Sequence, residues 1–315
     1  MKKILISMLA VAALVSCSKE ESIRVDQGEL ISFGNAFVDN STRAAVDPSY
    51  GANGEDLTEF KVWGTVNGGN GTVAIFAGDT VEGTVGTGNT WNCTTKTQYW
   101  IKDALYNFAA LVNATNDVAL DNLLPSKVNG FTADGATDLL YARSAQNIKG
   151  KASGNGLVDF TFEHLLSKVK FTVENTSVDA EEYSFKVNNI VINGNTTGDV
   201  TLASKTWDNL SDPDDYTVAE ITVYADETAG THKAECAQEL LLIPGDFNIT
   251  FNVDIYNGTT KLGSQAYPIA PVVYNQTLQA GYAYNFVIKV VVGEEIKFSV
   301  EKQPTWTNGG DITLQ

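Results

Sequence analysis

Strict alternation of apolar and polar residues in two late segments is the feature that most constrains this fold. Residues 247–255 follow it without a break, and residues 282–290 follow it nearly as well. A period of two places one face of a strand on a core and the other face in water. Half-buried strands of this kind are typical of antiparallel sandwiches. In the first segment the apolar positions are Phe247, Ile249, Phe251, Val253 and Ile255.

The rest of the chain shows the same character in shorter runs. Apolar residues alternate over residues 157–162 and 166–173, and Gly/Asn/Thr turns such as NGGNG and GTGN separate the runs. One short helix is expected at Asn116–Leu124, where Pro125 would end it. No repeat of fixed period occurs in the sequence. A chain of 315 residues suits two domains, and we expect their boundary near residues 163–168.

The N-terminus indicates export. Lys2 and Lys3 precede an apolar run, Ile4 to Val15, which is too short to span a bilayer and therefore predicts a secretory signal. The sequence LVSC resembles a bacterial lipobox, which would make Cys17 the lipid-bearing first residue of the mature chain. An ordinary signal peptide that is cleaved elsewhere is the alternative. The following SKEES resembles the surface-export tag of Bacteroides-type lipoproteins, and it also suits a solvated linker.

Residues 28–50 combine a predicted strand with a loop open to proteolysis. Ile31, Phe33 and Phe37 fall on one face at period two, although Asn35 interrupts the apolar pattern. The strand leads into a loop rich in Asp, Asn, Ser, Pro and Gly. That loop contains one arginine, Arg43, and no other Lys or Arg precedes Lys61. A trypsin-like cut there would detach the strand and leave its groove empty.

Charge and cysteine content exclude some functions. The net charge is −17, and it is unchanged by removal of residues 1–43, which carry five basic and five acidic side chains. A chain this acidic does not bind nucleic acid through a phosphate-neutralising patch. Besides Cys17 the chain has only Cys93 and Cys236, and their spacing leaves a disulfide between them open.

No motif predicts catalysis, a metal or a cofactor. The two histidines, His164 and His232, have no metal-ligand spacing, and a structural role is expected for His164. The Gly-rich residues 83–89 suit a hairpin turn. The acidic SDPDDY at residues 211–216 is expected to be a solvated turn rather than a Ca²⁺ loop. Exposed tryptophans such as Trp91 or Trp207 could stack on sugars, but in sandwiches they more often cap the core.

Seven stretches together resemble the major-fimbrillin family of Bacteroidia, the subunits of type V pili. Their order and spacing cover nearly the whole chain after Cys17. The resemblance implies an all-β fold of two transthyretin-like sandwiches, lipoprotein export to the outer membrane, removal of an N-terminal segment by an arginine-specific protease, and polymerisation by strand exchange into a surface fimbria. The stretches are TEFKVWG (58–64), TQYWIKDALYNFAAL (97–111), DLLYARS (138–144), FEHLLSKVKFTVEN (162–175), LLLIPG (240–245), LQAGYAYNFVIKV (278–290) and IKFSVEKQPTW (296–306).

Transferred to this sequence, the resemblance implies lipidation at Cys17 and a cut between Arg43 and Ala44. The donor would come from the tail Glu295 to Gln315, whose first half we interpret as the last strand of the second sandwich. The donor residues are then Trp306, Ile312 and Leu314. The expected divisions are a signal peptide (1–16), a propeptide with the removable strand (17–43), and two sandwiches (44–163 and 164–315).

Three functions remain open from the sequence alone. The first is a structural stalk pilin that supports cell adhesion, with other copies or related pilins, the protease and receptors on host or bacterial surfaces as partners. The second is an accessory or tip adhesin on the same scaffold; such subunits of the family tend to lack a usable C-terminal donor. This chain has a plausible donor, which favours the stalk pilin. The third is a monomeric surface lipoprotein that binds glycans.

Overall fold

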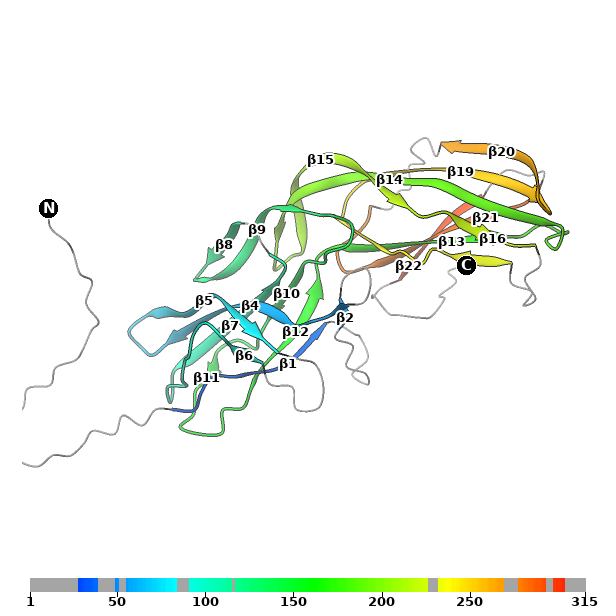
Figure 1. The fold of residues 1–315 in the computed structure, drawn as a ribbon. Helices are drawn as coiled ribbons and strands as arrows, with labels where there is room; N and C mark the ends of the chain where they lie inside the picture. The colour runs from blue at the N-terminus through cyan, green and yellow to red at the C-terminus, as the bar shows by residue number, and fades with distance from the viewer. Residues whose placement is uncertain are drawn as a thin grey trace, which may run out of the picture.

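The computed structural model describes residues 28–38, 49–50, 55–83, 91–114, 117–225, 232–268, 277–292 and 297–303. Every regular element in these ranges is a β-strand. The strands form two bodies arranged end to end, with the first half of the chain in one and most of the second half in the other (Figure 1). This confirms the predicted all-β fold. Across the described ranges, no helix is long and apolar enough to cross a membrane.

An eight-stranded sheet builds the first body. Its strands pair in the order β1 (Phe33–Val38), β12 (Val158–His164), β10 (Leu140–Arg143), β7 (Leu105–Val112), β4 (Glu59–Asn67), β5 (Thr72–Glu82) and β6 (Asn92–Cys93), with β11 (Ile148–Lys149) also on β7. Phe33 forms an antiparallel bridge with Trp91, the residue before β6. The two ends of the sheet therefore meet, and the sheet curls around an aromatic-rich core. A separate two-stranded piece consists of β2 (Ser49–Tyr50) and β3 (Glu55–Asp56).

Two sheets build the second body. One contains β17 (Lys233–Glu235), β13 (Ser167–Asn175), β21 (Ala283–Val290) and β22 (Lys297–Gln303), with β18 (Leu240–Leu242) also on β13. The other contains β20 (Thr260–Pro268), β19 (Phe247–Asn257), β14 (Tyr183–Thr201), β9 (Leu124–Thr132) and β8 (Asp117–Asp121), with β15 (Thr206–Val218) and β16 (Ile221–Val223) also on β14. Ile249, Phe251 and Val253 of β19 are buried between the sheets, as the alternation predicted.

The long strand β14 joins the two bodies. Its first part pairs with β19, and its last part, residues 197–201, pairs with β9 from the first half of the chain. A third cluster of buried apolar residues packs beneath this connection, with members from β7, β9 and β10 as well as β14 and β18. The β8–β9 hairpin precedes residues 163–168 in the sequence but extends a sheet of the second body. We therefore propose a domain boundary near residues 163–168 along the sequence, and this boundary does not separate the sheets.

The prediction of a helix at Asn116–Leu124 is wrong. Residues 117–121 form β8, which pairs with β9 through a two-residue turn at Asn122 and Leu123, both with positive φ. Two such residues define the type I′ turn whose twist suits a hairpin. The alternation of Val118 and Leu120 with polar or small neighbours is a period of two, and it outweighs helix propensity here.

The prediction of a solvated turn at residues 211–216 is also wrong, because these residues belong to strand β15. Pro213 lies opposite Asn195 of β14, and in the described part of the chain β15 pairs with β14 alone. An edge strand tolerates proline because its outward side needs no N–H donor. Charged residues and proline on an edge also discourage pairing with another chain.

Candidate strand-exchange site around β1

Strand β1 is hydrogen-bonded along one side to β12. The two run parallel, with Phe33 opposite Val158 and Val38 opposite Phe162. The amide of Val158 donates to the carbonyl of Ser32 at 2.9 Å. The neighbour on this side therefore comes from a segment more than 100 residues further along the chain.

The other side of β1 is hydrogen-bonded to residues 91–100. The amide of Ile31 donates to the carbonyl of Gln98 at 2.9 Å, and the amide of Trp100 donates to the carbonyl of Glu29 at 2.8 Å. Phe33 and Trp91 exchange both backbone bonds, at 3.1 and 3.2 Å. Residues 29–33 therefore pair with residues 91–100, residues 33–38 pair with β12, and the two ladders overlap at Ser32 and Phe33. Removal of the whole segment 29–38 would leave both partners unpaired.

Phe33 anchors this segment in the core of the first body. Its side chain is 0% exposed, and Ile31 is 4% exposed. The Phe33 ring centroid lies 5.7–6.1 Å from four other rings, a spacing that favours aromatic contacts. Those rings belong to Phe60, Phe76, Phe108 and Phe160.

A register shift between Phe33 and Ala36 changes which residues of β1 face inward. Beyond the shift, Val38 is buried at 4% exposure, although sequence reasoning did not select it. Phe37 lies opposite Thr161 in the ladder, and its side chain is outside the described part. The signal for the shift was Asn35, which interrupts the apolar alternation at the same place.

The surroundings of the segment are close at Glu29 and at Gly34. Asn155 donates to the Glu29 carboxylate from its backbone amide at 2.7 Å and from its side chain at 3.0 Å. These bonds, the backbone one first, lower the pKa of Glu29. At Gly34 an added Cβ would lie 2.4 Å from the Asp159 Oδ1 and 2.8 Å from the Leu157 Cβ. The segment therefore fits closely against β12 and residues 91–100, and we call this position the seat of β1.

Comparison with known proteins identifies the family. A family model described as fimbrillin-like matches residues 42–304. This chain belongs to the fimbrillin-like family. A fimbrial protein from Bacteroides vulgatus shares its fold with a TM-score of 0.58 at 14% identity, over 88% of this chain and 99% of the other. A candidate cell adhesion protein from Bacteroides ovatus gives 0.52 at 14% identity, over 90% and 99%. No functionally curated protein matches this chain in sequence.

Several residues selected from the sequence of this fimbrillin-like protein are outside the described ranges. They are Cys17, Arg43, Ala44, Trp306, Ile312 and Leu314. The strand expected from the first half of the tail is present as β22, which runs antiparallel to β21. In the described part of the chain β22 pairs only with β21. The first and last described strands are thus held differently.

The two tryptophans considered for sugar stacking pack inside the protein. Trp91 is fully buried and lies 5.4 Å from Phe60 between ring centroids. Trp207 is partly buried, contacts Phe131, and donates from its indole N–H to the carbonyl of Leu165 at 2.8 Å. Neither forms a sugar platform.

The buried polar groups of this fimbrillin-like protein have structural surroundings. His164 Nδ1 lies 2.6 Å from Asp138 Oδ2, and both side chains are buried near the connection between the bodies. Cys93 and Cys236 are free thiols, one half-buried in the first body and the other in the core of the second. Within the described ranges no group of three or more His, Cys, Asp and Glu residues is placed to hold a metal.

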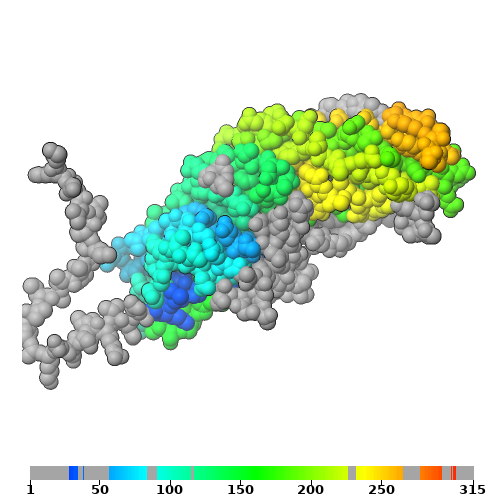
Figure 2. Space-filling model, viewed as in Figure 1, coloured from blue at the N-terminus to red at the C-terminus, as the bar shows by residue number. Residues whose placement is uncertain are grey.

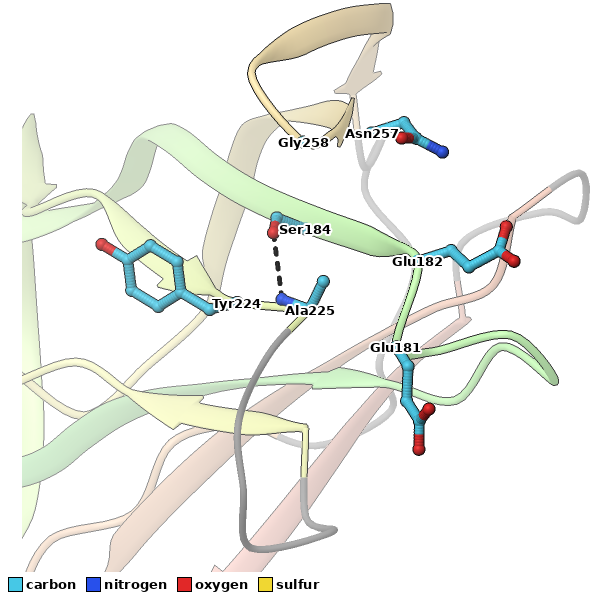
Figure 3. Close-up of a pocket in the computed structure, with 7 residues that line it drawn as sticks. All are labelled: Glu181, Glu182, Ser184, Tyr224, Ala225, Asn257 and Gly258. Atoms are coloured by element: carbon cyan, nitrogen blue, oxygen red, sulfur yellow. Dashed lines mark hydrogen bonds between the residues drawn. The ribbon is translucent and has the colours of Figure 1, made fainter.

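One open hollow lies at the far end of the second body, with a volume of about 660 Å³. Figure 3 shows that the side chains of Tyr224, Glu181 and Glu182 point in different directions around it. Ser184 Oγ accepts a hydrogen bond from the amide of Ala225 at 3.0 Å. These groups do not converge on one point, so the seat of β1 is the better-formed candidate site.

Proposed function

We propose that this protein is a structural subunit of a surface fimbria, exported as a precursor lipidated at Cys17. Cleavage between Arg43 and Ala44 frees the segment containing β1, and a donor strand from another subunit takes its seat. The fimbrillin-like family supports a structural, pilin-like role at the cell surface, as opposed to an enzymatic one. Other copies or related pilins, an arginine-specific protease and surface receptors are its proposed partners.

The observation that carries this proposal is the position of β1 between two edges. A strand with neighbours on both sides leaves a template for another chain when it is lost. An incoming strand restores the main-chain hydrogen bonds, and its side chains fill the vacated pockets, which is β-augmentation. The precursor fills its own groove, and it should therefore stay monomeric.

Side-chain burial sets the scale of the exchange. Ile31, Phe33 and Val38 are all buried, and each contributes roughly 1.5–3 kcal/mol by its burial. A cut after Arg43 breaks none of these contacts. The cut segment is then held without a covalent bond until a donor displaces it, so proteolysis permits exchange and the donor completes it.

The proposed donor is the tail beyond β22, with Trp306, Ile312 and Leu314 as its apolar residues. A synthetic peptide of residues 304–315 should bind the Arg-cut protein and block its polymerisation. The matched control peptide carries Ile312→Asp and Leu314→Asp and should do neither. Binding of both peptides with equal affinity would remove the tail as donor while leaving cleavage untouched.

N-terminal sequencing of fibres taken from the cell surface tests the whole proposal. An N-terminus at Ala44 is expected. Fibres whose subunits still carry residues 28–43 joined to Ala44 would overturn strand exchange at this site. A functional form that is monomeric and lipidated at Cys17 would instead favour an anchored subunit or a glycan-binding lipoprotein.

A further inference from the structure

Four exposed apolar side chains gather where the described chain begins. They are Leu30 (44% exposed), Tyr99 (40%), Ile101 (58%) and Leu105 (38%), and we call them the N-terminal patch. Figure 2 shows the exposed part of residues 28–34, in dark blue, at the surface of the first body and away from the second. Grouped exposed apolar residues mark interaction sites more often than single ones do.

Backbone contacts connect the segments that carry these four exposed side chains. Leu30 forms an antiparallel bridge with Tyr99. Residues 101–104 form a tight turn, in which the amide of Ala104 donates to the carbonyl of Ile101. Leu105 starts β7 and lies opposite Lys149 of β11. The amide of Asp103 donates to the carbonyl of Gly150 at 2.9 Å, which fixes the turn against β11.

The charges around the patch have the opposite balance to the whole protein. Lys102, Lys149 and Lys151 are exposed beside it. Of the carboxylates there, Asp103 pairs with Lys149 at 2.9 Å and Glu29 accepts hydrogen bonds from Asn155. Three lysines and two carboxylates give a local formal charge of +1 beside exposed Tyr, Ile and Leu, in a chain of net charge −17.

We propose that the N-terminal patch docks the precursor onto an anionic lipid surface. Aromatic and aliphatic side chains flanked by lysines are the composition of protein surfaces that lie on a membrane. The proposal rests on the proposed lipidation of Cys17. Ten residues lie between Cys17 and Gly28, and the eleven Cα–Cα steps that they span extend at most about 40 Å. The patch is then the part of the folded body held closest to the bilayer.

Cleavage after Arg43 would end this attachment when the segment leaves. Leu30 departs with the exchanged segment, together with Glu29 and the lipid tether. The remaining Tyr99, Ile101 and Leu105 then bind the surface more weakly, because Leu30 and the lipid anchor have both been lost. Docking would therefore keep the uncut precursor oriented on the membrane, and exchange would release it into the fibre.

Co-sedimentation of a lipid-free precursor with vesicles tests the patch independently of lipidation. The protein is the mature precursor with Cys17→Ser, and the vesicles are phosphatidylcholine alone or a 70:30 mixture with phosphatidylglycerol. Binding to the anionic vesicles is expected. Ile101→Glu with Leu105→Glu should lower it at least tenfold, and Lys102→Gln with Lys151→Gln should lower it by about fivefold per lysine. Leu262→Glu, an equally exposed apolar site on β20, is the matched control and should bind normally.

Three results would overturn the inference. The first is no vesicle binding by the unsubstituted protein, and the second is equal vesicle binding by the patch variants. The third is a dimer in solution that the patch variants abolish, because the patch would then bind a second copy of the protein instead of a membrane. Circular dichroism checks that the variants are folded. Labelling of Cys17 with a radioactive fatty acid and fibre formation are read separately, so failure of the patch and failure of the proposed function give different results.

Discussion

The first and last described strands of this fimbrillin-like protein are held in different ways, although both are close to a chain end. β1 pairs with β12, its first residue Phe33 also bonds Trp91 on the other side, and the Phe33 ring lies in the core of the first body. In the described part of the chain β22 is bonded only to β21. The family model begins at residue 42 and includes β22. The strand that places Phe33 in the core of the first body is therefore outside the segment that matches the family.

This difference suggests that the two bodies are completed from different sources. The second body encloses its core with strands of the matched region alone. The first body includes a segment that the proposed cleavage would release, and the proposed donor strand would then complete it. The following predictions test whether the two bodies really differ in this respect.

The largest expected effect is the loss of polymer in Arg43→Ala. Without the cut, the segment that contains β1 stays covalently attached and fills the groove. Precursor should accumulate as folded monomer, which size-exclusion chromatography and electrophoresis of unheated samples would show. Arg24→Ala is the matched control, because a cut at Arg24 would leave β1 attached to the body. Ladders of high-mass polymer in Arg43→Ala would refute the proposed activation.

Phe33→Ala separates the two bodies directly. Removal of a fully buried Phe costs about 3–5 kcal/mol, and the precursor should lose that much in its free energy of unfolding by urea. Fibres made from the same variant should be as stable as normal ones, because residue 33 is no longer in them.

Phe286→Ala in β21 is the control for this experiment. Phe286 is fully buried in the core of the second body, so its loss should weaken precursor and fibre alike. If Phe33→Ala also weakened purified fibres, the seat of β1 would not have been exchanged.

Gly34→Val measures how closely the seat fits. An added Cβ would lie within 2.8 Å of Leu157 Cβ and closer still to Asp159, and overpacking of this kind costs up to about 3 kcal/mol. The precursor should melt at a lower temperature, whereas the fibre should not change. Gly68→Ala is the matched control, since nothing lies within 4 Å of a Cβ at that turn.

The fold was readable from the sequence where burial follows a local period. The alternation at Ile249, Phe251 and Val253 predicted a half-buried strand, and β19 has these residues in the core. Ile31 and Phe33 were selected on the same basis and are buried. Local pattern carries this information because strand side chains alternate between faces.

Pairing partners and register were not readable in this way. The contact of β1 with both β12 and residues 91–100 joins segments far apart in the chain, and no local pattern encodes it. The shift after Phe33 moved burial to Val38, because one extra residue in a strand reverses its faces. The hairpin at Asn122 and Leu123 was missed because Leu is an unusual residue at positive φ.

The smallest expected effect concerns the second body and its behaviour in alkali. Burial raises the pKa of Tyr216 to about 12, with Asp134 and Asp214 adding to the shift. In the unfolded chain the phenol loses its proton near pH 10, so the stability contributed by this group is complete below pH 10 and is lost as pH rises towards 12. At pH 11 the loss should be about 1 kcal/mol.

Tyr216→Phe should remove this part of the pH dependence of the free energy of unfolding. At pH 8 the variant should differ from the parent only by its weak bond to the carbonyl of Ala133, at 3.5 Å. Because Tyr216 belongs to β15, which stays in the mature chain, precursor and fibre should respond equally. A pH response confined to the precursor would place the transferable part of the molecule in the second body and would reverse the comparison.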